Sequence, residues 1–487
     1  MPHSSNILET LPESEDIRSR AARELRIDAL QRLGFLVLWN TDEPGTIGAF
    51  LPVLEGAKAN TQVLGRGEAR PADEHARLVA VRQRPQRNEA LPPFESPSLS
   101  RIQLLIRPVL PARLELVNVG RRRLFVNGTH LEHAEIGPGD VIELGPQLTL
   151  LCTMRPRQFD ECASKLNHAF GEPDLHGFVG ESFAAWQLRS ELAFASPRNG
   201  HVLVFGSTGT GKELIARAIH NCSNRTGPLV ARNAATIPET LVDAELFGNM
   251  KGYPNPGMPE RKGLFGAAHT GSLFLDEFGD LPSGAQAHIL RVLDAGEYHR
   301  LGEESVRRSS FRLIAATNRP ESTLRADIVA RFEFRLRTPD LVQRREDVPL
   351  IACHLLKLMC ADDPELQQRF FMPNGLPRLS GGFMRKLVWQ DYTANVRELR
   401  NLLWLSVSKS RGDRLEWPEQ ESREAIPAGS DAPPDSDFAS DELQRALDAN
   451  NGSIEKTWRA LGLSNRHVLN RLVRKHGLSV TKQPSRE

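Results

Sequence analysis

Two kinds of segment are missing from this sequence: an apolar run that could cross a membrane, and the apolar core of a secretion signal. A membrane-spanning helix needs about 18 or more consecutive apolar residues, and the 487-residue sequence has no such run. Its first residues, MPHSSNILETLPESEDIRSR, are too polar for a secretory core. We therefore expect a cytoplasmic protein without a membrane partner.

Cysteine is scarce, and its positions follow no metal-binding spacing. Cysteine-based metal sites need closely spaced pairs, whereas the five cysteines are scattered as Cys152, Cys162, Cys222, Cys353 and Cys360. We expect reduced thiols that fill small apolar gaps, and we assign them no chemistry. The formal net charge of +1 excludes little by itself, because it hides local asymmetry.

The chain is longer than one ordinary core, and its composition divides it into parts. After an N-terminal extension (residues 1–32), residues 33–155 hold short β-rich runs broken by Gly, Pro and Asn, which is typical of a β-sandwich. Residues 178–407 alternate strands with helices, which predicts a parallel α/β sheet and then a helical lid. Residues 408–440, rich in Pro, Asp, Glu and Ser, indicate a flexible linker, and residues 441–479 are helical and basic.

A glycine-rich turn after a buried strand is the most informative feature of the chain. The stretch HVLVFGSTGTGKELIARAI begins at His201 and predicts the strand, loop and helix of a nucleotide phosphate cradle. Its glycines let backbone amides approach the phosphates, and its lysine adds a mobile positive charge. The residues expected to bind ATP here are Gly206, Ser207, Thr208, Gly209, Thr210, Gly211, Lys212 and Glu213. Glu213 stands where the general pattern has Ser or Thr, and an ordinary glycine-rich turn is the alternative.

Two adjacent acidic residues at the end of a second buried strand support the interpretation of the glycine-rich turn as a nucleotide-binding loop. In GSLFLDEFGDLP the run Leu273-Phe274-Leu275 ends in Asp276-Glu277. A carboxylate at a strand exit beside a phosphate loop can hold Mg²⁺ through water, and a second one can polarise the attacking water. Paired acids at a strand end are otherwise merely solvated. Together the two motifs predict that the protein binds and hydrolyses ATP.

The middle part resembles the AAA+ ATPase of bacterial enhancer-binding proteins, the activators of sigma-54 RNA polymerase. Five blocks carry the resemblance in family order: GSTGTGKELIARAIH, PETLVDAELFG, GSLFLDEFGDLP, FRLIAATNRP and ANVRELRN. The first block includes the glutamate after the lysine that the general phosphate-loop pattern disallows. The resemblance implies ATP and Mg²⁺ as cofactors. It implies that Lys212 binds phosphate, Asp276 holds the metal, Glu277 activates water, and Asn233 restrains Glu277 until nucleotide is sensed.

The resemblance also implies that the active site is shared between subunits. Thr317-Asn318 resembles the first sensor, at a strand end beside the γ-phosphate, with Asn318 expected to bind ATP, and Arg397 resembles the second sensor on the lid. Arg325 and Arg331 match the arginine fingers that cross a subunit interface, where a cation stabilises charge on the transferring phosphoryl group. A ring of identical subunits is therefore expected, although each arginine alone is more often an ordinary surface residue.

One departure from the family concerns the loop that touches sigma-54, where relatives carry the hexapeptide GAFTGA. The equivalent residues here are Gly252, Tyr253, Pro254, Asn255, Pro256 and Gly257. Each proline fixes φ and removes an amide, which predicts a stiff, extended loop. Three alternatives stay open: a drifted surface loop, an ATPase that acts on something other than sigma-54, or a sigma-54 contact made through Tyr253.

The C-terminal part resembles a Fis-type helix-turn-helix, as found at the end of these activators. Leu461-Gly462-Leu463-Ser464 would form the turn, with Ser464 as the N-cap of a second helix. The residues expected to face double-stranded DNA are Arg466, His467, Asn470, Arg471 and Arg474. A basic, solvated helix is the alternative.

The N-terminal sandwich resembles a forkhead-associated domain, a module that binds phosphothreonine. The matching residues include Leu64-Gly65-Arg66-Gly67, Leu99-Ser100-Arg101, Phe125-Val126-Asn127-Gly128 and residues 139–145. The resemblance implies that Arg66, Ser100 and Arg101 grip the phosphate of a phosphothreonine-containing protein. The pattern is incomplete, because Gln103 occupies the usual structural histidine position and Arg122 falls near a ligand-gripping asparagine. A sandwich without a ligand site is the alternative.

Together these features predict a multidomain transcription regulator: a forkhead-associated-like β-sandwich, an α/β P-loop ATPase with a helical lid, and a small all-α helix-turn-helix. Kinase signalling would enter at the sandwich, and ATP turnover in a ring would remodel the sigma-54 RNA polymerase holoenzyme near bound DNA. The alternative is a DNA-binding scaffold or repressor whose ATPase controls assembly alone.

Overall fold

The computed structural model describes most of the chain before residue 419 and a short part after it. The described residues are 31–54, 61–70, 73–85, 87–110, 112–159, 168–418, 440–450, 457, 461 and 473. Those up to Pro418 form one compact unit, and those after Glu419 belong to a second.

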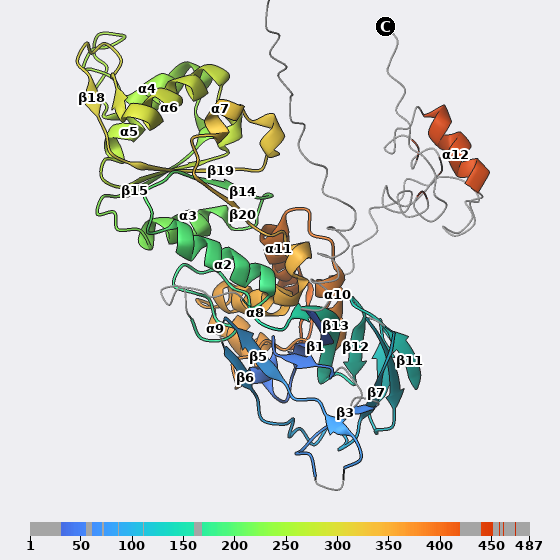
Figure 1. The fold of residues 1–487 in the computed structure, drawn as a ribbon. Helices are drawn as coiled ribbons and strands as arrows, with labels where there is room; N and C mark the ends of the chain where they lie inside the picture. Colours follow the sequence, from blue (N-terminus) through green and yellow to red (C-terminus); the bar gives the residue numbers. More distant parts are fainter. Residues whose placement is uncertain are drawn as a thin grey trace, which may run out of the picture. The chain divides into compact units, whose positions relative to one another are not determined.

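Two β-sheets form the N-terminal part of the first unit (Figure 1). The larger sheet has the order β10 (Thr129–Leu131), β9 (Leu124–Val126), β12 (Val141–Leu144), β13 (Leu148–Pro156), β1 (Gln31–Asn40), β2 (Phe50–Pro52), β5 (Val81–Arg84) and β6 (Arg87–Ala90). The smaller has the order β11 (His133–Ile136), β8 (Arg113–Asn118), β7 (Leu104–Leu110), β3 (Gln62–Leu64) and β4 (Ala76–Arg77). Apolar side chains of both sheets share one core, so this part is a β-sandwich, as the short β-rich runs predicted.

Strand β1 is buried on both faces, which is unusual for the outer side of a sandwich. Phe35 and Val37 point into the core between the sheets. Leu36 and Leu38, on the opposite face, belong to a second core that includes helices of the lid. Because side chains alternate along a strand, the continuous apolar run LGFLVLW serves two cores at once.

The middle part is built on a parallel sheet of five strands. Their order is β15 (Leu229–Asn233), β16 (Ser272–Asp276), β19 (Arg312–Thr317), β14 (Val202–Phe205) and β20 (Phe334–Arg337). Leu203 and Phe205 face one core, whereas Val202 and Val204 face another on the opposite side of the sheet. Burial on both faces explains why these strands are continuous apolar runs.

Helices cover both faces of this sheet. In Figure 1, helices α2 (Phe183–Ala195) and α3 (Lys212–Asn221) lie on one face. On the other face lie α4 (Val242–Phe247), α5 (Gly263–Ala267), α6 (Ser283–Ala295) and α7 (Ala326–Val329). A short hairpin, β17 (Glu297–Tyr298) and β18 (Arg307–Arg308), follows α6. Ser182 begins α2 by accepting a hydrogen bond from the amide of Ala185.

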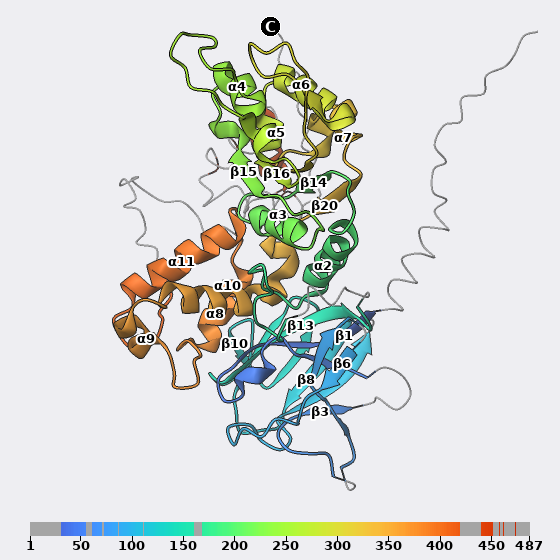
Figure 2. The ribbon, with the colours of Figure 1, turned by 90° about the vertical axis from the view of Figure 1, so that its left-hand side faces the viewer.

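The lid follows β20 and is entirely helical (Figure 2). It consists of η7 (Leu341–Asp347), α8 (Val348–Met359), α9 (Pro364–Phe370), α10 (Gly381–Trp389) and α11 (Asn395–Lys409). Side-chain caps fix three of these starts: Asp340 in a capping box before η7, Asp363 before α9 and Ser380 before α10. Apolar residues of α8, α10 and α11 share their core with β1 of the sandwich.

The four described cysteines, Cys152, Cys222, Cys353 and Cys360, are buried, in agreement with the expectation of gap-filling thiols. Burial raises the pKa of both Cys152 and Cys353 to about 12, so neither thiol ionises near neutral pH. Cys162 lies outside the described residues. Among the described residues, no helix is long and apolar enough to span a bilayer.

The second unit contains helix α12 (Ser440–Ala449), on which Leu443 and Leu447 are buried. Their spacing of four places them on one face of the helix. The predicted DNA-contacting residues, Arg466, His467, Asn470, Arg471 and Arg474, all lie outside the described residues.

Candidate nucleotide-binding site

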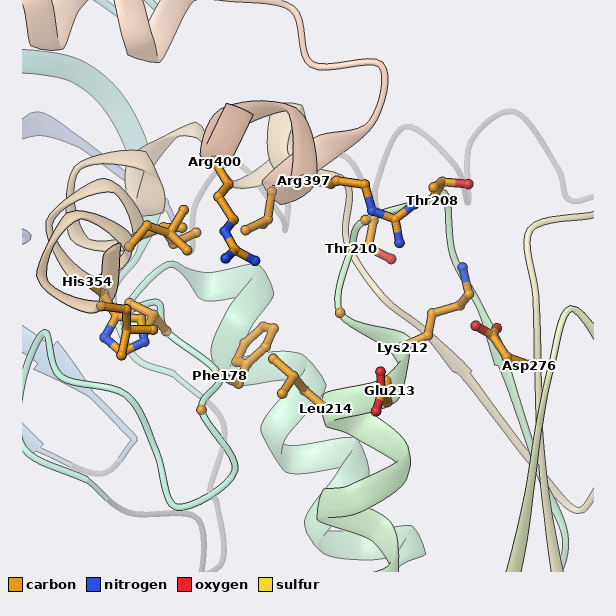
Figure 3. A pocket seen from close by; sticks show the side chains of 18 of the residues that line it. Phe178, Thr208, Thr210, Lys212, Glu213, Leu214, Asp276, His354, Arg397 and Arg400 are labelled. Carbon is orange, nitrogen blue, oxygen red and sulfur yellow. The ribbon is translucent and has the colours of Figure 1, made fainter. Parts of the chain in front are cut away.

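A cavity of about 620 Å³ opens where the parallel sheet meets the lid (Figure 3). One end is polar and carries Lys212 and Asp276, whose side chains point toward one another. The other end is lined by Phe178, Leu214 and His354. A polar end beside an apolar end suits a nucleotide, with phosphates at the first and a base at the second.

The glycine-rich loop forms part of the polar end and lies between β14 and α3, in the strand, loop and helix order that the sequence predicted. Lys212 is the first residue of α3, and its Nζ donates to the carbonyl oxygens of Gly206 (2.9 Å) and Ser207 (3.2 Å). Burial lowers the pKa of Lys212, and the nearby carboxylates of Asp276 and Glu277 oppose that shift. The lysine and the first amides of α3 together suit a phosphate group.

Two glycines of this loop are required by close contacts. A Cβ on Gly206 would lie 1.8 Å from Oγ1 of Thr338, and one on Gly209 would lie 2.1 Å from the carbonyl oxygen of Ala394 on the lid. Gly209 also has φ = +79°, where a side chain is strained. Any larger residue would therefore push the loop away from the sheet or from the lid.

The predicted carboxylates and the predicted asparagine meet at the same edge of the sheet. Parallel register pairs Asn233, at the end of β15, with Asp276, at the end of β16. Glu277 follows in the left-handed region (φ = +52°), and its amide donates to Oδ1 of Asp276 at 2.9 Å. All three residues line the cavity. A hard oxygen ligand beside a phosphate loop fits Mg²⁺, so Asp276 is the residue that would hold the metal.

The two predicted sensors lie in different surroundings. Arg397, on α11, lines the cavity, and the start of α11 contacts the phosphate loop through one backbone amide and one side chain. The amide of Val396 donates to the carbonyl of Gly209 (3.1 Å), and Nδ2 of Asn395 donates to the carbonyl of Thr208 (3.0 Å). Asn318 directly follows β19 but is exposed and is not among the residues that line the cavity.

The two predicted arginine fingers lie outside the cavity of their own chain. Arg325 forms an ion pair with Asp327 (2.6 Å), and Arg331 forms one with Asp294 (3.0 Å). The side chains of both arginines are about half exposed, at 42% and 50%. Within one chain they therefore contact no nucleotide site, and exposed ion pairs of this kind are weak enough to exchange partners.

The apolar end of the cavity contains residues that the sequence analysis missed. Phe178 and Val179 come from the segment before α2, His354 comes from α8, and Arg400 lies one turn beyond Arg397. Burial lowers the pKa of His354, which favours its neutral form. None of these residues belongs to a phosphate or carboxylate motif. The only local signal was the apolar pair Phe178-Val179 enclosed by glycines at the start of the predicted domain.

Arg344 of η7 also lines the cavity and is almost fully buried, at 3% exposure. Its guanidinium lies over the ring of Phe178, 4.6 Å from the ring centroid, and its Nη1 donates to the carbonyl of Val179 (3.2 Å). Burial lowers the pKa of Arg344, and Asp347 partly offsets this. The arginine thereby fixes the aromatic wall of the cavity.

The residues proposed to grip phosphothreonine also lie together, on adjacent loops of the sandwich. The amide of Arg66 donates to the carbonyl of Ser100 (3.1 Å). Arg77 joins the loops, because its Nη1 donates to the carbonyls of Arg66 (3.2 Å) and Arg101 (2.7 Å). The hydroxyl of Ser100 accepts from the amide of Arg121 (2.9 Å).

Gln103, at the position where the resemblance to forkhead-associated domains implies a histidine, is fully buried and connects these loops. Its Nε2 donates to Oδ1 of Asn118 (2.8 Å) and to the carbonyl of Arg122 (2.9 Å). Its Oε1 accepts from the amide of Ser100 (3.3 Å). The glutamine thus ties the Ser100 loop to the Arg122 loop.

The loop at residues 252–257 is exposed throughout and closes on itself. The amide of Gly252 donates to the carbonyl of Met258 (2.8 Å), and Nδ2 of the buried Asn249 donates to the carbonyl of Tyr253 (3.2 Å). Tyr253 packs against Gly302, where a Cβ would come within 2.7 Å of its ring. Both ends of the loop are therefore anchored.

We expect Glu277→Ala to bind ATP normally but to hydrolyse it about 10²–10⁴-fold more slowly, because it removes the group that activates water. Lys212→Ala should instead weaken ATP binding. The measurements are phosphate release and the dissociation constant for ATP. Asp243→Asn, which changes an exposed carboxylate on α4, is the control and should alter neither. Unchanged hydrolysis by Glu277→Ala would remove its assignment as the base.

Comparison with known proteins identifies related proteins over the part of the chain that forms this site. Residues 178–341 match the family described as the sigma-54 interaction domain. The chain is 35% identical over 311 residues to the transcriptional regulatory protein ZraR of Escherichia coli (strain K12), covering 61% of this chain and 68% of that protein. It is 33% identical over 336 residues to the anaerobic nitric oxide reductase transcription regulator NorR of Aeromonas hydrophila, covering 63% and 64%.

A solved structure of NtrX from Brucella abortus in complex with ADP is 28% identical to this chain. The match covers 62% of this chain and 70% of the NtrX chain, with a TM-score of 0.44. The share of ZraR that is matched, together with the sigma-54 interaction domain, identifies the family. The chain belongs to the sigma-54-dependent transcriptional regulators, and its sigma-54 interaction domain is an AAA+ ATPase domain.

Proposed function

We propose that this protein is an ATP-driven transcription regulator that binds DNA through its C-terminal part and receives a phosphothreonine signal at its sandwich. The observation that carries the proposal is the cavity in which Lys212, Asp276, Glu277 and Arg397 converge. A phosphate loop, two carboxylates and a lid arginine form the minimum set for coupling ATP hydrolysis to lid movement.

The same site supports assembly into a ring. Among the described residues that line the cavity, every cationic side chain comes from the phosphate loop or the lid. The exposed Arg325 and Arg331 are suited to supply a further cation to a neighbouring subunit. A finger contributed by a second subunit stabilises charge on the transferring phosphoryl group. Hydrolysis should therefore rise with protein concentration as rings form.

We propose that the loop at residues 252–257 weakens contact with sigma-54. A contact made only during hydrolysis needs a loop that can rise from the ring. Pro254 and Pro256 restrict that movement, and Asn255 lacks the methyl group of the family's threonine. The hydrogen bonds that close the loop and the packing of Tyr253 on Gly302 further restrain it.

We expect normal ATP turnover by the unmodified protein with weak or absent capture of sigma-54 in a nucleotide transition-state analogue. Restoring the family hexapeptide by Tyr253→Ala, Pro254→Phe, Asn255→Thr, Pro256→Gly and Gly257→Ala should create capture without raising hydrolysis. The control variant combines Pro254→Ala with Pro256→Ala, which frees the backbone without adding contact side chains. It should restore less capture of sigma-54 than the full family hexapeptide.

A different result would return the chain to ordinary sigma-54 activation. Strong capture by the unmodified protein, lost in Tyr253→Ala, would show that the aromatic contact has moved by one residue. If neither the unmodified nor the restored loop captures sigma-54 although ATP is hydrolysed, the alternative function gains support. In that alternative the ATPase controls assembly of a DNA-binding scaffold or repressor.

The sandwich loops support phosphate recognition because several cationic and hydroxyl groups lie together there. Arg66, Ser100 and Arg101 are on neighbouring loops, and the backbone contacts made by Arg77 hold two of them in place. A phosphothreonine carries about −1.5 to −2 charges, and charge-assisted hydrogen bonds from arginine suit it. Binding would link the regulator to a Ser/Thr kinase.

A phosphothreonine peptide library should yield binders of the full-length protein, and Arg66→Ala or Ser100→Ala should weaken that binding by removing a phosphate donor. Fluorescence anisotropy with phosphorylated and unphosphorylated peptides measures the effect. Arg113→Ala, an exposed arginine on β8, is the matched control. Equal binding of both peptide forms would leave the sandwich as a docking fold without a phosphate site.

Removal of all residues after Ser440 should abolish specific DNA binding and leave ATP hydrolysis intact, because the ATP site lies wholly before Pro418. Arg471→Ala should cost about 1–3 kcal/mol of binding free energy if it reads a base edge. Arg445→Ala on α12 serves as the control. A footprint at one site by the truncated protein would contradict the helix-turn-helix interpretation.

A further inference from the structure

The sandwich holds the stretch of backbone that forms one wall of the nucleotide cavity. Phe178 and Val179 line the cavity, and Glu181 follows them, buried at 1% exposure. Arg155 of β13 donates from Nη2 to the carbonyl of Glu181 (3.0 Å), and Arg84 of β5 donates from Nη2 to the carboxylate of Glu181 (2.7 Å). Two arginines of the sandwich therefore bind the chain within three residues of the cavity.

Arg155 also binds the lid. Its Nε donates to Oε2 of Glu346 in η7 (2.9 Å), and the hydroxyl of Thr153 donates to the other oxygen of that carboxylate (3.0 Å). The side chain of Arg155 is 2% exposed, so its charge depends on this pair for compensation. Arg155 thus joins the Glu181 segment and η7, which flank the same cavity.

The segment that contains Glu181 and the helix η7 also form hydrogen bonds with each other. The carboxylate of Asp347 accepts from the amides of Glu181 (2.7 Å) and Ser182 (2.8 Å) and from the hydroxyl of Ser182 (2.6 Å). Arg344 of the same helix packs on Phe178 inside the cavity. A displacement of Glu346 or Glu181 would therefore reach the cavity wall directly.

Apolar packing places helix α8 between the cavity and the sandwich. Ile351 and Leu355 line the nucleotide cavity. Leu350 and Cys353 line a second hollow of about 250 Å³. Ile47, in the segment between β1 and β2, lines this hollow from the sandwich side. Residues one position apart on a helix face different directions, so one helix serves both contacts.

The network has a defined charge state. Burial raises the pKa of Glu181, but hydrogen bonds from His168 and Arg84 outweigh it and bring the pKa down to about 2. The carboxylate is therefore ionised at neutral pH and stays paired with Arg84. Its contribution to stability is lost only as the pH falls from about 4.5 toward 2.

We propose that Arg155 is a positioning residue for the ATPase reaction. By holding Glu181 and Glu346, it makes the sandwich a structural part of the nucleotide site, and loss of this contact lowers the affinity for nucleotide. Removal of the guanidinium leaves the Glu346 carboxylate and the Glu181 carbonyl without their buried partner. The wall formed by Phe178, Val179 and Arg344 then loses its outer support.

The test uses the full-length protein and measures ADP binding by calorimetry, together with KM and kcat for ATP. Arg155→Met and Glu346→Gln should each raise the dissociation constant for ADP and KM about tenfold, with a smaller change in kcat. Arg155→Lys keeps the charge but lacks the planar guanidinium that binds Glu181 and Glu346 together, so its dissociation constant and KM should lie between those of Arg155→Met and the unmodified protein.

The matched control is another ion pair in the same contact between sandwich and lid. Arg385 of α10 donates to the carboxylate of Glu143 at 2.7 Å, and neither residue lines the nucleotide cavity. Arg385→Met should leave the ADP dissociation constant and KM within about twofold of the unmodified values. Thermal unfolding of every variant verifies that it remains folded.

Two results would overturn the proposal. One is unchanged ADP binding in a folded Arg155→Met or Glu346→Gln variant. The other is an equal loss of binding in Arg385→Met, which would show that the sandwich acts only through overall stability. If Arg155→Met fails to fold, Glu346→Gln decides the question, because it preserves side-chain volume and the hydrogen bond from Thr153.

Discussion

Parallel pairing of the central strands is the constraint on which the rest of the site depends. Strands β14, β15, β16 and β19 run in one direction, so the segments that leave their carboxyl ends meet at one edge of the sheet. The phosphate loop leaves β14 there, and register sets Asn233 of β15 beside Asp276 of β16. Residues far apart in the chain thereby become one site, and the lid only has to cover it.

The lid is held to this edge from both sides. Toward the sheet, backbone and side-chain hydrogen bonds from Val396 and Asn395 reach the phosphate loop, a contact so close that only glycine fits at position 209. Toward the sandwich, apolar side chains of α8, α10 and α11 share a core with β1. Burial of apolar surface supplies most of the stability of such a contact, and the buried ion pairs set its geometry.

The departures from family patterns have different structural consequences. Gln103 stands where the resemblance to forkhead-associated domains implies a histidine, and its buried amide group makes three hydrogen bonds that tie two loops together. The loop at residues 252–257 is exposed, so its prolines disturb no apolar core. A substitution at position 103 would leave buried polar groups without partners, whereas side chains at residues 252–257 are exposed to solvent.

The sequence by itself determined the elements whose signals are local. Apolar runs predicted the strands, and the glycine loop with Lys212 and the acids at Asp276 predicted the polar end of the cavity, because each motif is complete within a few consecutive residues. Only the tertiary structure decided the apolar end, which Phe178 and His354 line, and the contact made by Arg155. Those residues carry no local motif. Their roles arise from packing between segments that lie far apart in the sequence. The pattern of side chains within one segment does not show which distant segment will pack against it.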